Sequence, residues 1–359
     1  MTGQTGRGMK RRTFVAGGSA AIAVAVLPGP LRAASKGKQV NVYSFDTYIG
    51  DNTIANFTAA TKITVRYDVY ANNEELFAKL KTKNPGYDVI VPSDYMVATM
   101  IGTKLLLPID KAKVPNLSNI DPTFTNPPFD PGLKYSVPYM WGTVGIGYRK
   151  SKVKGEPASW SHIFGPEADA YKGRIVAIDD ERVMIGVALK YLGYSLNSTK
   201  KEEIAAARDL LIKAKKNFKT FSPDGGQDIL LAGDADLVVE YNGDIIQVMR
   251  QDKDLSYVLP KEGSMRWTDN LCIPRGAPNP ENALAWINFV QDAKQNAEIV
   301  ATIHYATPNA AARKLVDPAD LKNPIIYPPD AILAKCETLI DVGKNVRLYD
   351  EAWTAVKAA

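Results

Sequence analysis

Residues 86–93, Gly-Tyr-Asp-Val-Ile-Val-Pro-Ser, form a nearly continuous apolar run that ends in a proline and a serine. Such a run predicts a strand that is buried on both faces, as in a parallel sheet. Earlier in the chain, residues 40–43 have a short strand pattern, and residues 63–69 alternate apolar and polar side chains. We therefore expect three strands in the first part of the fold.

Helical patterns separate these strands. Residues 52–60 predict one helix, and a second begins where Asn72 or Asn73 caps a segment with two glutamates in its first turn. Leu76 and Leu80 lie four residues apart in that segment, so they share one face of the helix. The order strand, helix, strand, helix, strand predicts an α/β fold, in which ligands bind beyond the carboxyl ends of the strands.

The second half of the chain predicts a further set of elements. Residues 138–148 form a long strand pattern whose glycines predict a bend or a hinge, and residues 199–202 resemble a capping box that opens a helix. A chain of 359 residues is too long for one ordinary core, so we expect two lobes, each a mixed sheet flanked by helices, with a cleft between them. The expected lobes are residues 37–141 with 268–315 and residues 142–267 with 316–359.

The N-terminal segment, residues 1–34, holds the excess charge of the chain. Five of the 44 basic residues lie in it and none of the 39 acidic residues does, which leaves 39 residues of each sign in the rest. A balanced body gives no reason to expect a nucleic acid or an anionic membrane as a partner. The five basic residues are Arg7, Lys10, Arg11, Arg12 and Arg32.

The same segment has the form of an export signal. Residues 10–15, Lys-Arg-Arg-Thr-Phe-Val, are a twin-arginine start, and residues 16–27 are too short an apolar run to span a membrane. With a cleavage site near residues 31–34, we expect a cleaved twin-arginine signal peptide and a periplasmic protein. Cys272 and Cys336 are the only cysteines; they could pair in that compartment, but their predicted settings do not show that they are close.

Aromatic and acidic residues recur in the loops that follow predicted strands. A cleft lined by such loops suits a flexible polycation, because aromatic faces cover methylene groups and carboxylates pair with ammonium groups. The residues of these loops are Phe45, Asp46, Tyr48, Ser93, Asp94, Tyr95, Asp179, Asp180, Tyr241 and Asp244.

One further stretch, residues 263–270, combines the same chemistry within a strand pattern. Trp267 and Asp269 are two residues apart, so they point to the same side of an extended backbone. An indole face beside a carboxylate is what an alkylammonium ion needs. A core tryptophan next to a turn aspartate is the alternative interpretation of this pair.

The sequence offers little for catalysis or metal binding. His162 and His304 are the only histidines, and no spacing of His, Cys or Glu suits a metal. Asp179 and Asp180 could serve a glycosidase, but adjacent aspartates are more often a loop or a helix cap. A ferric-binding cleft would use tyrosines and acids without an indole wall. We therefore expect a protein that is not an enzyme and has no cofactor and no metal.

Several stretches together resemble the periplasmic spermidine/putrescine-binding proteins of bacterial ABC transporters. The resemblance extends from about Val40 to the C-terminus. It implies a two-lobed, hinge-closing periplasmic binding protein fold of type II, a polyamine ligand, partners that are the membrane permease and ATPase subunits, and a monomer. The stretches are residues 86–93, 136–142, 192–195, 260–263, 267–269 and 305–313.

The resemblance also implies roles for individual residues. Asp269 would take a terminal ammonium group, and Trp267 would pack on the amine chain. Asp244 resembles the acid of putrescine-preferring members. Further matches to ligand contacts of the family are Tyr48, Ser93, Tyr95 and Asp180.

Departures from the family pattern concern the identity of the amine. Val183 stands where the family usually has a glutamate, and Leu339 stands where a spermidine binder can have a glutamine. Phe45 and Tyr241 stand where tryptophans are common. Val183, Leu339 and Asp244 favour a diamine such as putrescine, whereas Trp267, Asp180, Glu181 and Glu240 match or mimic a spermidine site. The alternatives are a receptor for another cationic amine, such as an opine or an aminophosphonate, and a periplasmic hydrolase.

Overall fold

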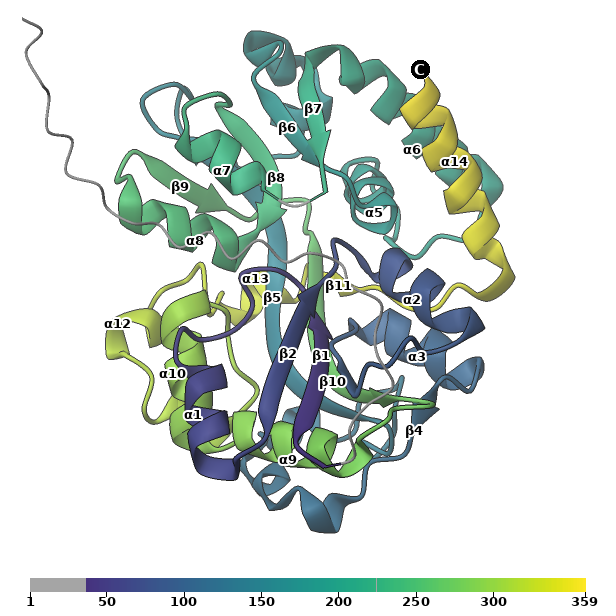
Figure 1. Ribbon diagram of the computed structural model, residues 1–359. Coiled ribbons are helices and arrows are strands. Elements are labelled where there is room, and N and C mark those ends of the chain that lie inside the picture. Colours follow the sequence, from purple (N-terminus) through teal and green to yellow (C-terminus); the bar gives the residue numbers. More distant parts are fainter. Residues whose placement is uncertain (1–36, 224) are drawn as a thin grey trace, which may run out of the picture. The chain divides into compact units, whose positions relative to one another are not determined.

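The computed structural model describes residues 37–223 and 225–359, so the expected signal peptide, residues 1–34, lies outside the described residues. Its strands join in a mixed sheet with the order β2-β1-β3-β10-β5-β8-β6-β7, to which β4, β9 and β11 add at the sides (Figure 1). The strands are β1 (Gln39–Ser44), β2 (Thr64–Val69), β3 (Val89–Ile90), β4 (Leu106–Leu107), β5 (Ser136–Arg149), β6 (Ile175–Ile178), β7 (Phe218–Ser222), β8 (Leu237–Tyr241), β9 (Leu255–Val258), β10 (Met265–Pro274) and β11 (Glu337–Thr338).

Helices flank this sheet along its whole length (Figure 1). The α-helices are α1 (Thr53–Thr61), α2 (Asn73–Thr82), α3 (Asp94–Gly102), α4 (Ser161–Phe164), α5 (Glu181–Tyr191), α6 (Lys201–Ala214), α7 (Gly226–Leu231), α8 (Asn242–Gln251), α9 (Pro280–Val290), α10 (Ala293–Ile303), α11 (Ala310–Arg313), α12 (Pro318–Leu321), α13 (Asp330–Leu333) and α14 (Val346–Ala358). The 3-10 helices are η1 (Lys111–Lys113), η2 (Pro115–Asn119), η3 (Pro122–Phe124), η4 (Pro166–Tyr171), η5 (Lys215–Asn217) and η6 (Gly343–Asn345). None of the helices in the described part of the chain combines the length and the apolarity that a membrane span requires.

The first lobe is built on β1, which pairs in parallel with β2 and β3, as the sequence predicts. Strand β3 is shorter than its apolar run, because Pro92 has no N–H group to donate to a ladder. Just before β3, the buried carboxylate of Asp88 accepts the backbone N–H groups of Asn41 and Asn279 at 2.8 and 2.6 Å. Asp88 thereby ties β1 to the start of α9. The predicted cap of α2 is Asn72, whose side chain accepts the N–H group of Glu75.

Two long antiparallel strands, β5 and β10, run from the first group of strands into the second (Figure 1). The glycines of β5 do not interrupt the strand, since Ser136–Arg149 is continuous. They make room for neighbours instead. A Cβ atom on Gly142 would lie 2.6 Å from Cζ2 of Trp267, so only glycine allows the indole to pack against this strand.

The second lobe is built on β6, which pairs in parallel with β7 and β8, while β9 pairs with β5. Helices α5, α6 and α14 pack against one another beside these strands. The predicted capping box at residues 199–202 is wrong. Helix α6 begins at Lys201 after Lys200, which provides no side-chain cap, and Ser198 instead donates to the Glu203 carboxylate at 2.6 Å.

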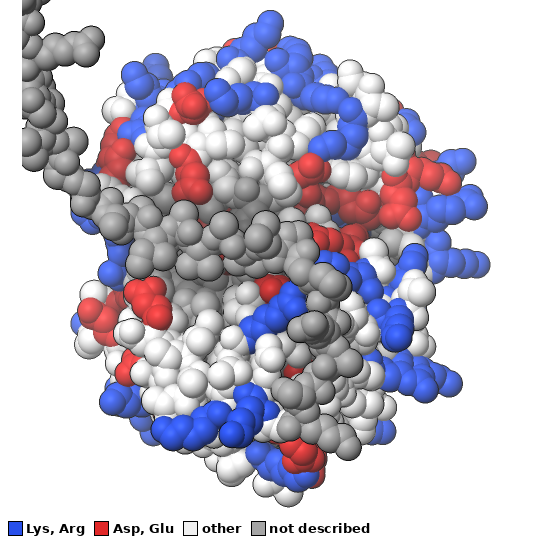
Figure 2. All heavy atoms as spheres, in the orientation of Figure 1, with Lys and Arg blue, Asp and Glu red and all other residues white. Residues whose placement is uncertain are grey.

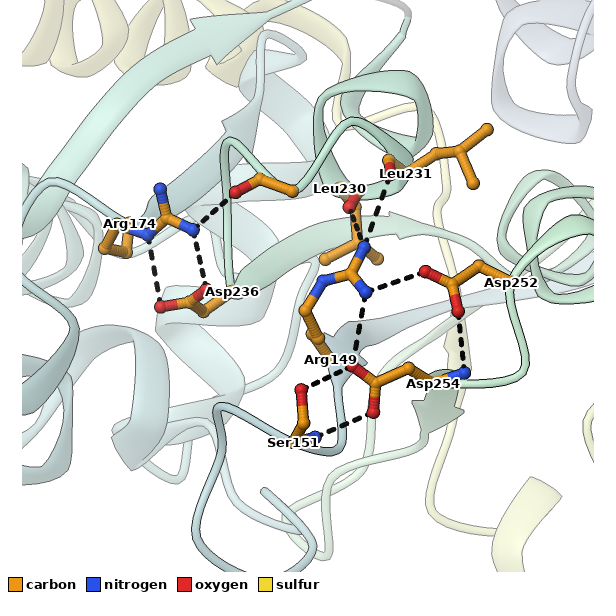
Figure 3. A network of polar contacts seen from close by, with 9 residues as sticks. Arg149, Ser151, Arg174, Leu230, Leu231, Asp236, Asp252 and Asp254 are labelled. Atoms are coloured by element: carbon orange, nitrogen blue, oxygen red, sulfur yellow. Dashed lines mark hydrogen bonds and ion pairs between the residues drawn. The ribbon is translucent and has the colours of Figure 1, made fainter.

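A network of ion pairs fixes the outer edge of the second lobe (Figure 3). Arg149, the last residue of β5, contacts Asp252 at 2.7 Å and Asp254 at 3.2 Å, and it donates to the carbonyls of Leu230 and Leu231. One guanidinium group therefore joins the ends of β5, α7, α8 and β9. Strand β8 lies among these elements and leads to the cleft, so the network also holds β8 in place.

Candidate functional site

A cavity opens between the two groups of strands, and both contribute to its walls. The space between the walls is about 600 Å³, including the part that is open to solvent. The residues that line it are Phe45, Asp46, Tyr48, Ala71, Asn73, Ser93, Tyr95, Asp180, Val183, Pro223, Tyr241, Asp244, Met265, Trp267, Asp269, Tyr305 and Leu339. Of the loop and strand residues that the sequence suggests for the cleft, all except Asp94 and Asp179 lie here.

Asp269 lies on β10, where the ladder with β5 has an irregularity between Asp269 and Asn270. Its carboxylate accepts a hydrogen bond from the Ser93 hydroxyl at 2.6 Å, and Ser93 in turn is held by two hydrogen bonds with the Asn73 side chain. Asp269 is 4% exposed. Burial raises the pKa of Asp269 to about 7, and the hydroxyl groups of Ser93 and Tyr48 oppose this rise. An opposite charge at this position would restore the ionised form.

Trp267 forms the centre of an aromatic wall. Its ring lies 5.1 Å from the ring of Tyr305, 5.8 Å from that of Tyr241 and 6.4 Å from that of Tyr48, each in an edge-to-face arrangement. Phe45 extends the wall through an edge contact with Tyr48 at 5.9 Å. These rings line the cavity, and aromatic faces attract cations and cover methylene groups.

Asp244 reaches the cavity from the first turn of α8 in the second lobe. The hydroxyl group of Tyr305 donates to its Oδ2 atom at 2.7 Å. This contact requires Gly243, because a Cβ atom there would lie 2.5 Å from the Tyr305 ring. The pair joins the second lobe to the segment after α10, so the acid and the phenol are held in one fixed arrangement.

Asp180 and Val183 lie together at the start of α5. The Asp180 side chain caps the helix by accepting the Val183 N–H group at 2.9 Å. Burial raises the pKa of the Asp180 carboxyl group, and the cap bond opposes it. Asp179, the neighbouring acid, instead pairs with Lys357 at 2.7 Å. Asp46 lies at the exposed rim, where it accepts its neighbour's backbone N–H group.

Asp94 lies elsewhere, although its two neighbours in the sequence reach the cavity. It is the first residue of α3, and it lines a separate hollow beside Arg266 and Thr268. Its carboxylate accepts the backbone N–H groups of Tyr95 and Thr268. Desolvation raises its pKa to about 8. These contacts tie α3 to β10 and leave this side chain out of the cavity wall.

Sequence reasoning missed several wall residues, of which Tyr305 is the most consequential. It follows His304, whose φ of 56° ends α10 in the left-handed conformation. A non-glycine residue with positive φ at a helix end is uncommon, and no pattern in the sequence marks it. The other missed residues are Ala71, Asn73, Pro223 and Met265.

The charged residues of the wall are all acidic. The wall carries Asp46, Asp180, Asp244 and Asp269, while no Lys, Arg or His lines it in the described part of the chain. Within residues 37–223 and 225–359, no group of three or more His, Cys, Asp or Glu side chains could hold a metal ion. Both cysteines are free thiols, so the pairing left open by the sequence does not occur in this structure. Carboxylates among aromatic rings can bind an organic cation.

A model of the family described as bacterial extracellular solute-binding protein matches residues 52–328. The spermidine/putrescine-binding periplasmic protein of Salmonella typhimurium is 37% identical over 327 residues, which are 90% of this chain and 93% of that protein. A putrescine-binding periplasmic protein of Pseudomonas aeruginosa is 35% identical over 342 residues, which again cover 90% of this chain and 93% of that protein.

Solved structures show the same likeness. A putative spermidine/putrescine ABC transporter protein from Listeria monocytogenes is 35% identical and superposes with a TM-score of 0.85. The superposition covers 89% of this chain and 99% of that one.

Proposed function

The chain belongs to the bacterial extracellular solute-binding proteins, and from this premise we propose that it is the periplasmic receptor of a polyamine ABC importer. The type II periplasmic binding protein fold that the sequence predicts is confirmed by the structural relatives. The matched relatives are named as periplasmic binding proteins, and the solved structure as an ABC transporter, which supports a receptor without catalytic turnover.

One observation carries the proposal of a polyamine ligand. The cavity combines an aromatic wall with carboxylates from both lobes, and none of the described residues that line it is basic. An ammonium group that enters such a cavity gives up its hydration, and carboxylates in the wall can pair with it. Asp269 is the acid of the first lobe in this scheme, and Asp244 and Asp180 are those of the second. A polyamine that reaches both sides would favour the closed arrangement.

We propose in addition that a diamine is preferred over spermidine. The middle ammonium group of a triamine needs its own counter-charge or water. Val183 and Leu339, both buried in the wall, can provide neither. Asp180 remains available to a longer amine, so the preference depends on how far the ligand extends toward α5.

Competitive titration calorimetry with putrescine, cadaverine and spermidine tests this proposal. Putrescine is expected to bind most tightly, and tighter binding of spermidine than of either diamine would overturn the diamine preference. Small-angle scattering with and without ligand tests closure. If none of the three amines binds and the radius of gyration stays unchanged, the polyamine receptor itself is contradicted, and an opine, an aminophosphonate or a hydrolase substrate becomes the better candidate.

The route of export is a separate proposal, supported by the twin-arginine start at residues 10–15, which lies outside the described residues. Replacing Arg11 and Arg12 together by lysine should keep the charge but prevent recognition by the twin-arginine pathway. The double variant should accumulate uncleaved in the cytoplasmic fraction. Unchanged processing would contradict this route without affecting the proposed ligand.

A further inference from the structure

Arg182, the second residue of α5, is a buried cation outside the ligand cavity. Its side chain is among the largest that are almost fully buried, at 2% exposure, and it does not belong to the cavity wall. Burying an arginine this deeply is costly unless its charge is compensated. Only part of its hydrogen-bonding capacity is used, since its Nη2 atom donates to the Ile340 carbonyl at 3.2 Å and its buried Nε atom has no partner within the described residues.

The remaining contacts of Arg182 are aromatic, and they come from both lobes. The guanidinium carbon lies 4.5 Å from the ring centroid of Tyr349 on α14, which belongs to the same lobe. It lies 5.4 Å from the ring centroid of Tyr95 on α3 of the first lobe. Tyr349 is fixed within the second lobe, because its hydroxyl donates to the carbonyls of Leu196 and Ser198. Only the contact with Tyr95 therefore depends on how close the lobes are.

Carboxylates from both lobes surround this contact. The Tyr95 hydroxyl donates to the Glu74 carboxylate at 2.9 Å, and Glu74 lines a hollow with Asp179, Asp180 and Glu181. Figure 2 shows acidic side chains gathered in the region where α2 and α5 lie in Figure 1.

Repulsion within this group would oppose an approach of the lobes. Burial, and then the charge of Asp180, raise the pKa of Glu74 to about 7, whereas the charge of Arg182 lowers it. The same guanidinium lowers the pKa of Asp180 against its desolvation. A positive charge at Arg182 thus favours the ionised form on both sides of the contact.

We propose that Arg182 is a positioning residue for closure: it docks on Tyr95 as the lobes close and compensates Glu74 and Asp180 without touching the ligand. This inference rests on the proposed function, since closure is read out through polyamine binding. Arg182 remains attached to its own lobe through Tyr349 and Ile340 in either state. It gains Tyr95 and the charge of Glu74 only in the closed one. A group with such a difference between two states shifts their populations.

A double-mutant cycle between Arg182 and Glu74 tests this role with putrescine as the probe. Arg182→Met should weaken binding about 2- to 30-fold, the range expected for a cation–π contact of this kind. Glu74→Gln in the Arg182→Met background should recover a large part of the loss, because the uncompensated acid is then gone. A role limited to packing within the second lobe would show no such recovery, since Glu74 lies on the other lobe.

Controls separate closure from folding. Arg208→Met makes the same change on α6, where the arginine pairs with the adjacent Asp209, and it should leave affinity and scattering unchanged. Should Arg182→Met fail to fold, the cycle is run with Arg182→Gln, which removes the charge and keeps a planar polar end. Scattering of the ligand-bound Arg182 variant should indicate a more open average shape.

The outcomes distinguish this inference from the function on which it rests. If the parent binds putrescine and Glu74→Gln has the same effect in both backgrounds, Arg182 is not a closure residue, while the receptor stands. If the parent binds no polyamine, the receptor proposal fails first and the inference fails with it.

Discussion

Two clusters of aspartates differ in how their negative charge is compensated. At the outer edge, Asp252 and Asp254 share Arg149, and the pKa of each carboxyl group is lowered (Figure 3). Hydrogen bonds come first among the causes, from the N–H group of Asp254 to Asp252 and from Ser151 to Asp254. In the cavity, burial instead raises the pKa of Asp269 to about 7.

This difference in pKa separates a cluster that stabilises the fold from one that can bind a cation. The edge cluster contains its own cation, so its acids are ionised in the folded protein and contribute to stability. The cavity wall has aromatic rings and no basic side chain among the described residues that line it, so a bound cation would supply a counter-charge to Asp269. The buried acids of the cavity thus lower the stability of the unliganded protein, and their pairing with a bound cation contributes to the binding free energy.

The largest expected effect comes from removing the acid of the first lobe. Asp269→Asn removes a charge-assisted hydrogen bond to the ligand and should weaken putrescine binding by about 10- to 150-fold. The unliganded variant should be at least as stable as the parent, because a buried charge is gone. Titration calorimetry and thermal unfolding measure the two effects. The matched control is Asp46→Asn, the same change at the exposed rim, where screening by water limits the loss to about threefold.

The opposite pattern is expected at the edge cluster. Arg149→Met leaves Asp252 and Asp254 without their shared cation and the carbonyls of α7 without a donor. The free energy of unfolding should fall by about 2 kcal/mol, while the affinity for putrescine should change little. Urea unfolding of the parent and the variant measures the first quantity and calorimetry the second. A variant that loses affinity but keeps its stability would remove the distinction between the two clusters.

The raised pKa of Asp269 makes binding dependent on pH. Its carboxyl group has a folded pKa of about 7, above the usual value of about 3.9, so the unliganded protein loses stability as the pH rises from about 4 to 7. Binding of a cation favours the ionised form, so affinity should rise over the same range, by at most about tenfold per pH unit for each linked carboxylate. Calorimetry from pH 5.5 to 8 tests the slope. Asp269→Asn should reduce it, and an equal slope in parent and variant would assign the dependence to another group.

The smallest expected effect concerns the phenol that holds Asp244. Tyr305→Phe keeps the ring against Trp267 and removes one hydrogen bond, which contributes about 1 kcal/mol, or roughly a fivefold change in affinity. Asp244→Asn in the same assay should cost more than Tyr305→Phe. If the two variants lose equal affinity, the phenol and not the acid is the group that matters at this end of the site.

The sequence predicts some of the elements and side chains around the cavity and not others. The strand before Ser93 and the helix capped by Asn72 follow from local patterns, and the structure has both. Asp94 was misplaced because α3 begins at that residue and turns its side chain to the far side of β10, which depends on tertiary packing. Tyr305 was missed because its position requires the left-handed His304 and the space at Gly243, two conditions far apart in the chain.

We expect the cavity to recognise ammonium charge, and titration calorimetry of the parent at pH 7.5 with ligands of equal length can test this expectation. The ligands are putrescine, butylamine and 1,4-butanediol, which carry two, one and no ammonium groups on a four-carbon chain. We predict that putrescine binds much more tightly than butylamine and that the diol gives no measurable heat of binding. A diol that binds as tightly as putrescine, or a putrescine titration without binding, would contradict this expectation.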